Sequence, residues 1–343
     1  GCDLLRVEFI DPDRDLVRTR ELAREYGLTR PNTIVFECSG RRKFVEDKDI
    51  SEYGLQVTES GGMSRRLLAY KAEQAISSAI QNVRQETAPV VYFVAGHGER
   101  DVNDYSRHSG YSSIARLMRR DNIEVRTLFL SKNGRVPVDC SALVIAGPDR
   151  KYSDAELEII AGYLAKSGRL LCLIDPAVAT GLDSLLDEWG VELSREVAMG
   201  LTLTGRELVV TTYGEHPITR NFHNLTTMFY MPRCIDPVVS EASARTSVTI
   251  LATNTEEGWG ETSLEQTPSR YDPGIDRPGP VPIAVAVEKG PSSGIDVELP
   301  PSKLVVAGDS AFVCNGALRT GVGGNSDFFM SALNWLLERE ALM

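Results

Sequence analysis

The sequence predicts an α/β protein whose main sheet is mostly parallel and doubly wound, with helices on both faces. Apolar runs of strand length alternate with segments of helical periodicity along the 343 residues. The runs at 90–95, 141–146 and 170–174 are almost wholly apolar, which is typical of parallel strands that are covered on both faces. The connections between these elements are short, so right-handed crossovers should join the strands.

A smaller α/β domain is predicted to come first, over residues 1–87. Its strands are expected at 4–10 and 32–38, and a helix at about 13–26 should end at Gly27, a plausible capping residue. Leu16, Leu22, Ala23 and Tyr26 would face inward from that helix. The stretch that follows Cys38 is polar and irregular. Apolar residues then recur at helical spacing from Ala72 to Val83, and "QETAP" (85–89) predicts the domain boundary.

The second domain, residues 88–343, has the cleaner alternation. Helices are predicted at 112–121, 181–190 and 326–339, and Ser153 with Glu156 forms a capping-box pattern that opens another helix. The long Pro- and Gly-rich segment 259–282 is predicted to be a loop. It could be a lid, a docking arm for a partner, or only a mobile link. The strands are expected at 90–95, 124–130, 141–147, 169–175, 207–213, 246–253, 281–290 and 302–309.

Composition and charge limit the classes of function. A formal net charge of -11 argues against sequence-independent binding to nucleic acid. The basic "RLMRR" (116–120) is either a local basic patch or a solvated helix face. No apolar run reaches the ~20 residues of a membrane span, and charge comes too early in "GCDLLRVEFIDPD" for a signal peptide. The six cysteines lack zinc-type spacing and are expected to be buried free thiols; a disulfide stays open as the alternative, although nothing in the sequence requires one.

Polar residues gather where the predicted strands end. Ligands of open parallel sheets bind outside the carboxyl ends of the strands, so we expect these side chains to meet at one rim. His97 with Glu99 suits proton transfer or ligand contact. Alternatively, His97 bonds a neighbouring loop, while Glu99 and the aspartates accept backbone N–H groups. The predicted ligand-binding residues are His97, Glu99, Asp175, Asp309 and Ser310.

Known catalytic templates are absent from the sequence. There is no G-x-S-x-G, P-loop, G-x-G-x-x-G after a strand, or H-E-x-x-H. Glu215 and His216 lie in a predicted turn and are weak candidates for a site. The chain is therefore expected to be non-enzymatic, with no cofactor and no metal.

Ordered segments along nearly the whole chain resemble the auxiliary proteins of gliding-motility-type ABC transport systems. The segments are "VEFIDPDRD", "AEQAISSAI", "VYFVAGHGE", "LVIAGPDRKYSDAELEIIAGYLAKSGRLLCLIDP", "LLDEWGV", "HPIT", "WGET" and "KLVVAGDSAFVCNGAL…GGNSDFFMSALNWL". The resemblance implies an extracytoplasmic (periplasmic) domain, tethered by a transmembrane helix at each end. It also implies an ABC permease and ATPase as partners. The sequence would then be a fragment cut between those helices.

The resemblance also implies an amidotransferase-like, flavodoxin-like fold for the second domain, shared with an intraflagellar-transport protein and with ThuA-like proteins. That kinship suggests carbohydrate binding by analogy of fold only. Amidotransferases place a catalytic Cys on an elbow after a strand, whereas Cys172 lies inside its predicted strand. The scaffold is therefore expected without that chemistry.

Three functions remain open. The leading hypothesis is a non-catalytic accessory domain that binds a ligand or a partner protein at the rim. The second is a metal-assisted hydrolase that uses His97, Glu99 and Asp175. The third is a structural module that recognises only protein.

Overall fold

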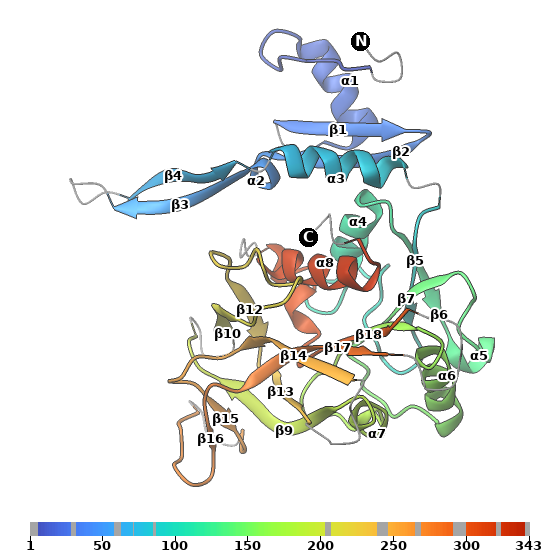
Figure 1. Cartoon of the computed structure of the whole chain (residues 1–343), viewed down its shortest axis with the longest axis vertical. Helices are drawn as coiled ribbons and strands as arrows, with labels where there is room; N and C mark the ends of the chain where they lie inside the picture. The colour runs from blue at the N-terminus through green and yellow to red at the C-terminus, as the bar shows by residue number, and fades with distance from the viewer. Residues whose placement is uncertain are drawn as a thin grey trace. The chain divides into compact units, whose positions relative to one another are not determined.

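The computed structural model divides into two compact units, residues 1–85 and 86–343, which are described separately (Figure 1). The structure describes residues 6–28, 32–57, 63–70, 72–84, 87–202, 207–238, 246–264, 269–290, 300–319 and 324–339. Within these ranges, no helix combines the length and the apolar character needed to cross a bilayer.

The first unit combines antiparallel strand pairs with helices. Strand β1 pairs with β2, and β3 pairs with β4. Helix α3 contacts β1 and β2, and it buries Ala79 and Val83 while β2 buries Val45. The elements are α1 (Leu16–Tyr26), β1 (Thr33–Cys38), β2 (Arg41–Glu46), α2 (Asp47–Ile50), β3 (Ser51–Val57), β4 (Met63–Tyr70) and α3 (Ala72–Arg84).

Some predictions for this unit are confirmed and others are wrong. Helix α1 ends at Gly27, whose φ of 64° is left-handed and whose N–H donates to the Ala23 carbonyl. The strand predicted at 4–10 is wrong for its described part, residues 6–10, where Phe9 is 93% exposed and packs into no core. Leu16, predicted to face inward, is 57% exposed. The stretch after Cys38, predicted to be irregular, instead forms β2, α2, β3 and β4. That prediction is wrong because antiparallel strands with one face in water can contain many polar residues.

The second unit is built on an eight-stranded sheet with the order β11-β14-β17-β18-β8-β7-β5-β6. The strands from β18 to β6 are parallel, whereas β17, β14 and β11 join with antiparallel pairing. The α/β class is therefore confirmed, with a mixed sheet. Its strands are β5 (Val90–Val94), β6 (Glu124–Leu128), β7 (Cys140–Ala146), β8 (Arg169–Leu173), β11 (Thr212–Tyr213), β14 (Thr246–Thr253), β17 (Pro282–Lys289) and β18 (Ser302–Ala307).

Helices cover both faces of this sheet, as the sequence predicts (Figure 1). Alternate strand residues point to opposite faces, so Val91 and Val144 belong to one apolar core while Leu143 and Ile145 belong to the other. Helices α4 (Ser112–Arg120) and α8 (Gly324–Leu336) pack into the first core. Helices α6 (Asp154–Leu164) and α7 (Asp183–Asp187), with Leu130 of α5 (Leu130–Asn133), pack into the second. The predicted capping box of Ser153 and Glu156 opens α6.

Two smaller antiparallel sheets complete the unit. One has the order β13-β9-β15-β16, and β10 pairs with β12 in the other. The segment 259–282, predicted to be a loop throughout, contributes β15 and β16 to the first of these, so that prediction is wrong in part. The lid and docking roles stay predictions. These strands are β9 (Val191–Met199), β10 (Glu207–Val210), β12 (Thr227–Tyr230), β13 (Arg233–Pro237), β15 (Trp259–Glu261) and β16 (Arg277–Pro278), and the short 3-10 turns are η2 (Ala311–Val313) and η3 (Ala317–Arg319).

Candidate functional site

Four loops leave the sheet at the carboxyl ends of β5, β7, β8 and β18. The parallel pairing of these strands brings the loops to one edge. The loop after β5 reaches the loop after β18 through hydrogen bonds that span about 200 sequence positions, such as the 2.9 Å bond from Arg100 Nε to Ser310 Oγ. The predicted rim therefore exists as a set of loops that contact one another.

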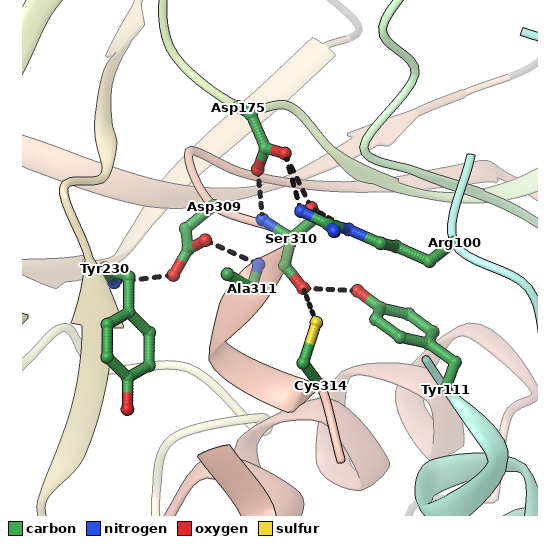
Figure 2. A network of polar contacts seen from close by, with 8 residues as sticks. All are labelled: Arg100, Tyr111, Asp175, Tyr230, Asp309, Ser310, Ala311 and Cys314. Atoms are coloured by element: carbon green, nitrogen blue, oxygen red, sulfur yellow. Dashed lines mark hydrogen bonds and ion pairs between the residues drawn. The ribbon is translucent and has the colours of Figure 1, made fainter. Parts of the chain in front are cut away.

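A network of polar contacts connects three of these loops (Figure 2). Asp175, two residues after the end of β8, accepts a hydrogen bond from the Ser310 backbone N–H at 2.6 Å and another from Ser310 Oγ at 2.8 Å. Arg100 bridges the same two residues, because its Nη2 lies 3.2 Å from Asp175 Oδ2. We call Arg100, Asp175, Asp309 and Ser310 the aspartate network. The Arg100 and Asp175 side chains are 22% and 24% exposed, and Ser310 is fully buried.

Asp309 supports the backbone around this network. One carboxylate oxygen accepts the Tyr230 N–H at 2.7 Å and the other accepts the Ala311 N–H at 2.6 Å (Figure 2). The residue is 1% exposed. Burial, followed by the nearby Asp175 carboxylate, raises the pKa of Asp309 from 3.8 to about 8, although both N–H bonds and Arg100 work in the opposite direction. Asp309 is thus a buried acid whose charge is costly.

The other neighbours of Ser310 hold its backbone in place. The Tyr111 hydroxyl donates to the Ser310 carbonyl at 2.5 Å, and Cys314 Sγ lies 4.0 Å from the same oxygen (Figure 2). Burial raises the pKa of Cys314 to about 12, so its thiol stays protonated. Gly147 permits the close approach of the loop after β7: its φ is 61°, and a Cβ atom there would lie 2.3 Å from Ser310 Oγ.

A second cluster, the histidine cluster, joins the turn after β5 to the start of α6. His97 Nδ1 lies 3.5 Å from Glu99 Oε1, and its Nε2 lies 3.2 Å from Glu156 Oε2. The Tyr152 ring lies 4.2 Å from the imidazole, and its hydroxyl donates to Glu99 at 2.5 Å. Burial and the Glu99 carboxylate raise the pKa of Tyr152. Glu156 also accepts bonds from Ser153, so the cap of α6 and the imidazole share one carboxylate.

The five predicted residues therefore fall into two adjoining groups rather than one. Asp175, Asp309 and Ser310 share the aspartate network, whereas His97 and Glu99 belong to the histidine cluster; the consecutive Glu99 and Arg100 connect them. Asp309, Ser310 and the Glu99 side chain have almost no exposed surface. That these five residues contact a ligand stays a prediction. Of the five, the His97 and Asp175 side chains are the ones partly exposed to solvent.

Sequence reasoning missed three participants: Arg100, Tyr152 and the second role of Glu156. The sequence could have indicated Arg100, because it directly follows Glu99 at a rim where two aspartates were expected. A cation there would balance their negative charge. Tyr152 and Glu156 belong to a loop and helix that the sequence does not mark as neighbours of His97.

The chemistry of these groups is that of a rigid, internally bonded surface. Ser310 Oγ is buried and bonded to both Arg100 and Asp175, so it does not present a free nucleophile. Cys172 lies inside β8 and is fully buried, and burial raises its pKa. Among the described residues, no group of three or more His, Cys, Asp or Glu side chains is arranged to hold a metal ion.

A family comparison relates this chain to transport, and a comparison with solved structures relates it to a known fold. Residues 88–338 match the auxiliary-protein family model described as "ABC-type uncharacterized transport system". Comparison with curated proteins finds no significant match. The solved mmIFT52 N-terminal domain is similar over 72% of this chain and 97% of its own, with 17% identity and a TM-score of 0.53, which shows likeness of fold alone. A putative ThuA-like protein from Bacteroides uniformis ATCC 8492 matches with 10% identity over 74% of this chain and 92% of its own, at a TM-score of 0.43.

Proposed function

The chain belongs to the ABC-type uncharacterized transport system family of auxiliary proteins, and we propose that it is a non-catalytic accessory domain that binds at the loop rim of its sheet. The family match over residues 88–338 is the observation that carries this proposal. Membership implies association with transporter components. The proposed location is the extracytoplasmic face of the membrane, with anchoring segments that connect the domain to the permease.

The geometry of the rim supports binding rather than catalysis. Its aspartates are already engaged: Asp175 accepts from Ser310 and Arg100, and Asp309 accepts two backbone N–H groups. A general acid, base or nucleophile must reach a substrate atom, whereas these groups are engaged within the fold. Such bonding instead fixes the loops in one conformation, which lowers the entropy cost of binding.

An amidotransferase-like, flavodoxin-like scaffold is the finer proposal for the fold. The fold likeness to the mmIFT52 domain supports this kinship. Cys172 lies within β8 rather than on a turn after it, so the proposed scaffold acts without amidotransferase chemistry. A carbohydrate ligand is one class that this scaffold could bind, and it belongs in the experiment below.

Co-purification tests the proposal. The chain, tagged and kept in its native membrane context, should carry the permease and ATPase of its transport system through affinity purification and mass spectrometry. Its absence from those complexes would overturn the accessory role. The purified protein should also show no turnover against glycoside and ester substrates with or without added divalent metal. Turnover that Asp175→Asn or His97→Gln abolishes would favour the hydrolase instead.

A rim-binding role also predicts how ligand affinity changes. A carbohydrate panel, measured by calorimetry, should lose any detected binding in Asp175→Asn but not in Lys166→Glu. Lys166 is an exposed residue between the end of α6 and the start of β8, at the amino end of that strand rather than at the rim. Equal loss in both variants would place the ligand elsewhere.

A further inference from the structure

The loop 101–110 carries a rigid polar surface beside the aspartate network. The Asp104 carboxylate accepts bonds from the Ser106 N–H at 2.7 Å and from the Ser109 hydroxyl at 2.8 Å. Asn315, from the loop after β18, donates through Nδ2 to the carbonyls of Asp104 and Ser106 at 3.0 and 2.9 Å. The loop backbone is therefore held from inside and from the neighbouring loop.

This framework brings three segments that carry basic residues close to one another. The Gly316 N–H donates to the Arg107 carbonyl at 2.6 Å, and a Cβ at Gly316 would lie 2.9 Å from Arg107 Cγ. Arg319 is one turn beyond Gly316, because its N–H donates to the Gly316 carbonyl at 3.1 Å. Asn315 also accepts the Ser113 N–H at 2.8 Å, which brings Arg116 on the next turn of α4 nearby. We call Arg107, His108, Arg116 and Arg319 the basic patch; all four are exposed.

The arginines of the basic patch have no ion-pair partner in the part of the chain that the structure describes. Among the described residues, no carboxylate forms an ion pair with Arg107, Arg116 or Arg319. The carboxylates of the same loop have local bonds: Asp104 holds Ser106 and Ser109, and Asp101 accepts the Asn103 N–H at 2.8 Å. Unpaired cations on a chain of net charge -11 stand out against a mostly acidic background.

The same loop also exposes an aromatic ring. Tyr105 is 85% exposed although its loop is held by the bonds of Asp104 and Asn315. Tyr and Arg, with Trp, are enriched among the residues that dominate binding energy at protein interfaces, and Arg pairs well with carboxylates. A ring so fully exposed does not line a cavity for a small ligand.

We propose that the basic patch with Tyr105 docks an acidic protein segment of the transporter assembly. This inference rests on the proposed accessory function and names the chemistry of the partner. Arg107 and Arg319 would pair with carboxylates of that segment, and the Tyr105 ring would pack against its apolar atoms. The fixed loop would meet the partner without a cost for ordering.

The test uses the full chain and its own transporter. The affinity of the tagged chain for the detergent-purified permease–ATPase complex is measured at low and at physiological salt for three proteins: wild type, Arg107→Glu/Arg319→Glu, and the control Arg135→Glu/Lys166→Glu. The control changes the net charge equally at exposed positions outside the patch. A photo-crosslinking phenylalanine analogue at Tyr105 then locates the contact by mass spectrometry.

The expected result is at least a tenfold loss of affinity in the patch variant, little change in the control, and crosslinks to an Asp- and Glu-rich segment. Affinity should fall with salt in wild type more than in the patch variant. Equal affinity of the patch variant and wild type would overturn the inference while the accessory function stands. Failure of wild type itself to bind would instead refute the accessory function. Patch-dependent binding to protein-free phosphatidylglycerol vesicles, without crosslinks to protein, would assign the patch to lipid and also overturn it.

Discussion

The buried carboxyl of Asp309 should make the stability of this protein fall as pH rises. In the folded state its pKa is raised from 3.8 to about 8, mainly by burial and then by Asp175. The folded protein therefore keeps a proton that the unfolded chain releases above its ordinary pKa. The protonated Asp309 therefore stabilises the fold fully below about pH 4, and this contribution to the free energy of unfolding is lost as pH rises through about 8.

The magnitude follows from one proton. Where the folded state holds that proton and the unfolded state does not, the equilibrium constant for unfolding rises up to about tenfold for each pH unit. The change should be steepest between about pH 5 and 7 and should level off above 8. Asp309→Asn cannot ionise, so it should lack this slope. Its amide can accept only one of the two N–H bonds, from Tyr230 and Ala311, and the lost bond should cost about 1–3 kcal/mol at pH 5.

Urea denaturation of wild type and Asp309→Asn from pH 5 to 9 measures this difference. Every other titrating group is common to both proteins, so the gap between their free energies of unfolding isolates Asp309. Wild type should be the more stable protein at pH 5, and its advantage should fall by up to about 1.4 kcal/mol for each pH unit, so that the difference reverses sign by about pH 8. As a second control, Asp175→Asn should move the slope of the wild-type curve to lower pH, because it removes a charge that raises the Asp309 pKa. A gap that stays constant across the range would refute the reasoning.

Three further predictions concern single positions. Gly308→Ala should cost about 1–3 kcal/mol of stability, because its Cβ would lie 1.9 Å from the Arg233 carbonyl oxygen. The control Gly162→Ala, in open space on α6, should gain about 0.5–1 kcal/mol. Equal effects of the two substitutions in denaturant titrations would contradict this prediction. Burial and Lys303 lower the pKa of His216 from 6.5 to about 4. Wild type should therefore lose stability as pH falls from about 6.5 to 4, and His216→Asn should lose less. Melting temperatures that fall equally in both proteins between pH 7 and 4.5 would refute this prediction. Ser153→Ala should cost about 0.5–2 kcal/mol by removing the cap of α6, and a melting temperature equal to that of wild type would count against a stabilising cap.

The sequence predicts the main sheet well because its parallel strands are buried on both faces. The almost wholly apolar β5, β7 and β8 leave little choice of structure, and the local bonds of Ser153 and Glu156 mark where α6 begins. The antiparallel addition of β17 beside β18 was not predictable, because strand pairing depends on contacts that are distant in sequence. In the first unit, the polar β2 lacks the apolar alternation that would have identified it.

The candidate site was predictable in its position but not in its connections. Strand ends identify His97, Asp175 and Asp309 as rim residues, since parallel strands share one carboxyl edge. The partner of each depends on loop conformation. Only three-dimensional packing shows that Arg100 pairs with Asp175. The same is true of the contact between His97 and the cap residue Glu156.

The bonds across the rim join distant parts of the chain, and this has a consequence for how the protein folds. Tyr111 bonds Ser310 across 199 positions, Arg100 bonds Ser310 across 210, and Asn315 bonds Asp104 across 211. Each of these bonds closes a loop of about 200 residues, and such distant pairings slow folding because the long loop must close before the contact forms. The aspartate network therefore forms only after the segment that carries Ser310 has docked, because Ser310 is the shared partner of Arg100, Tyr111 and Asp175.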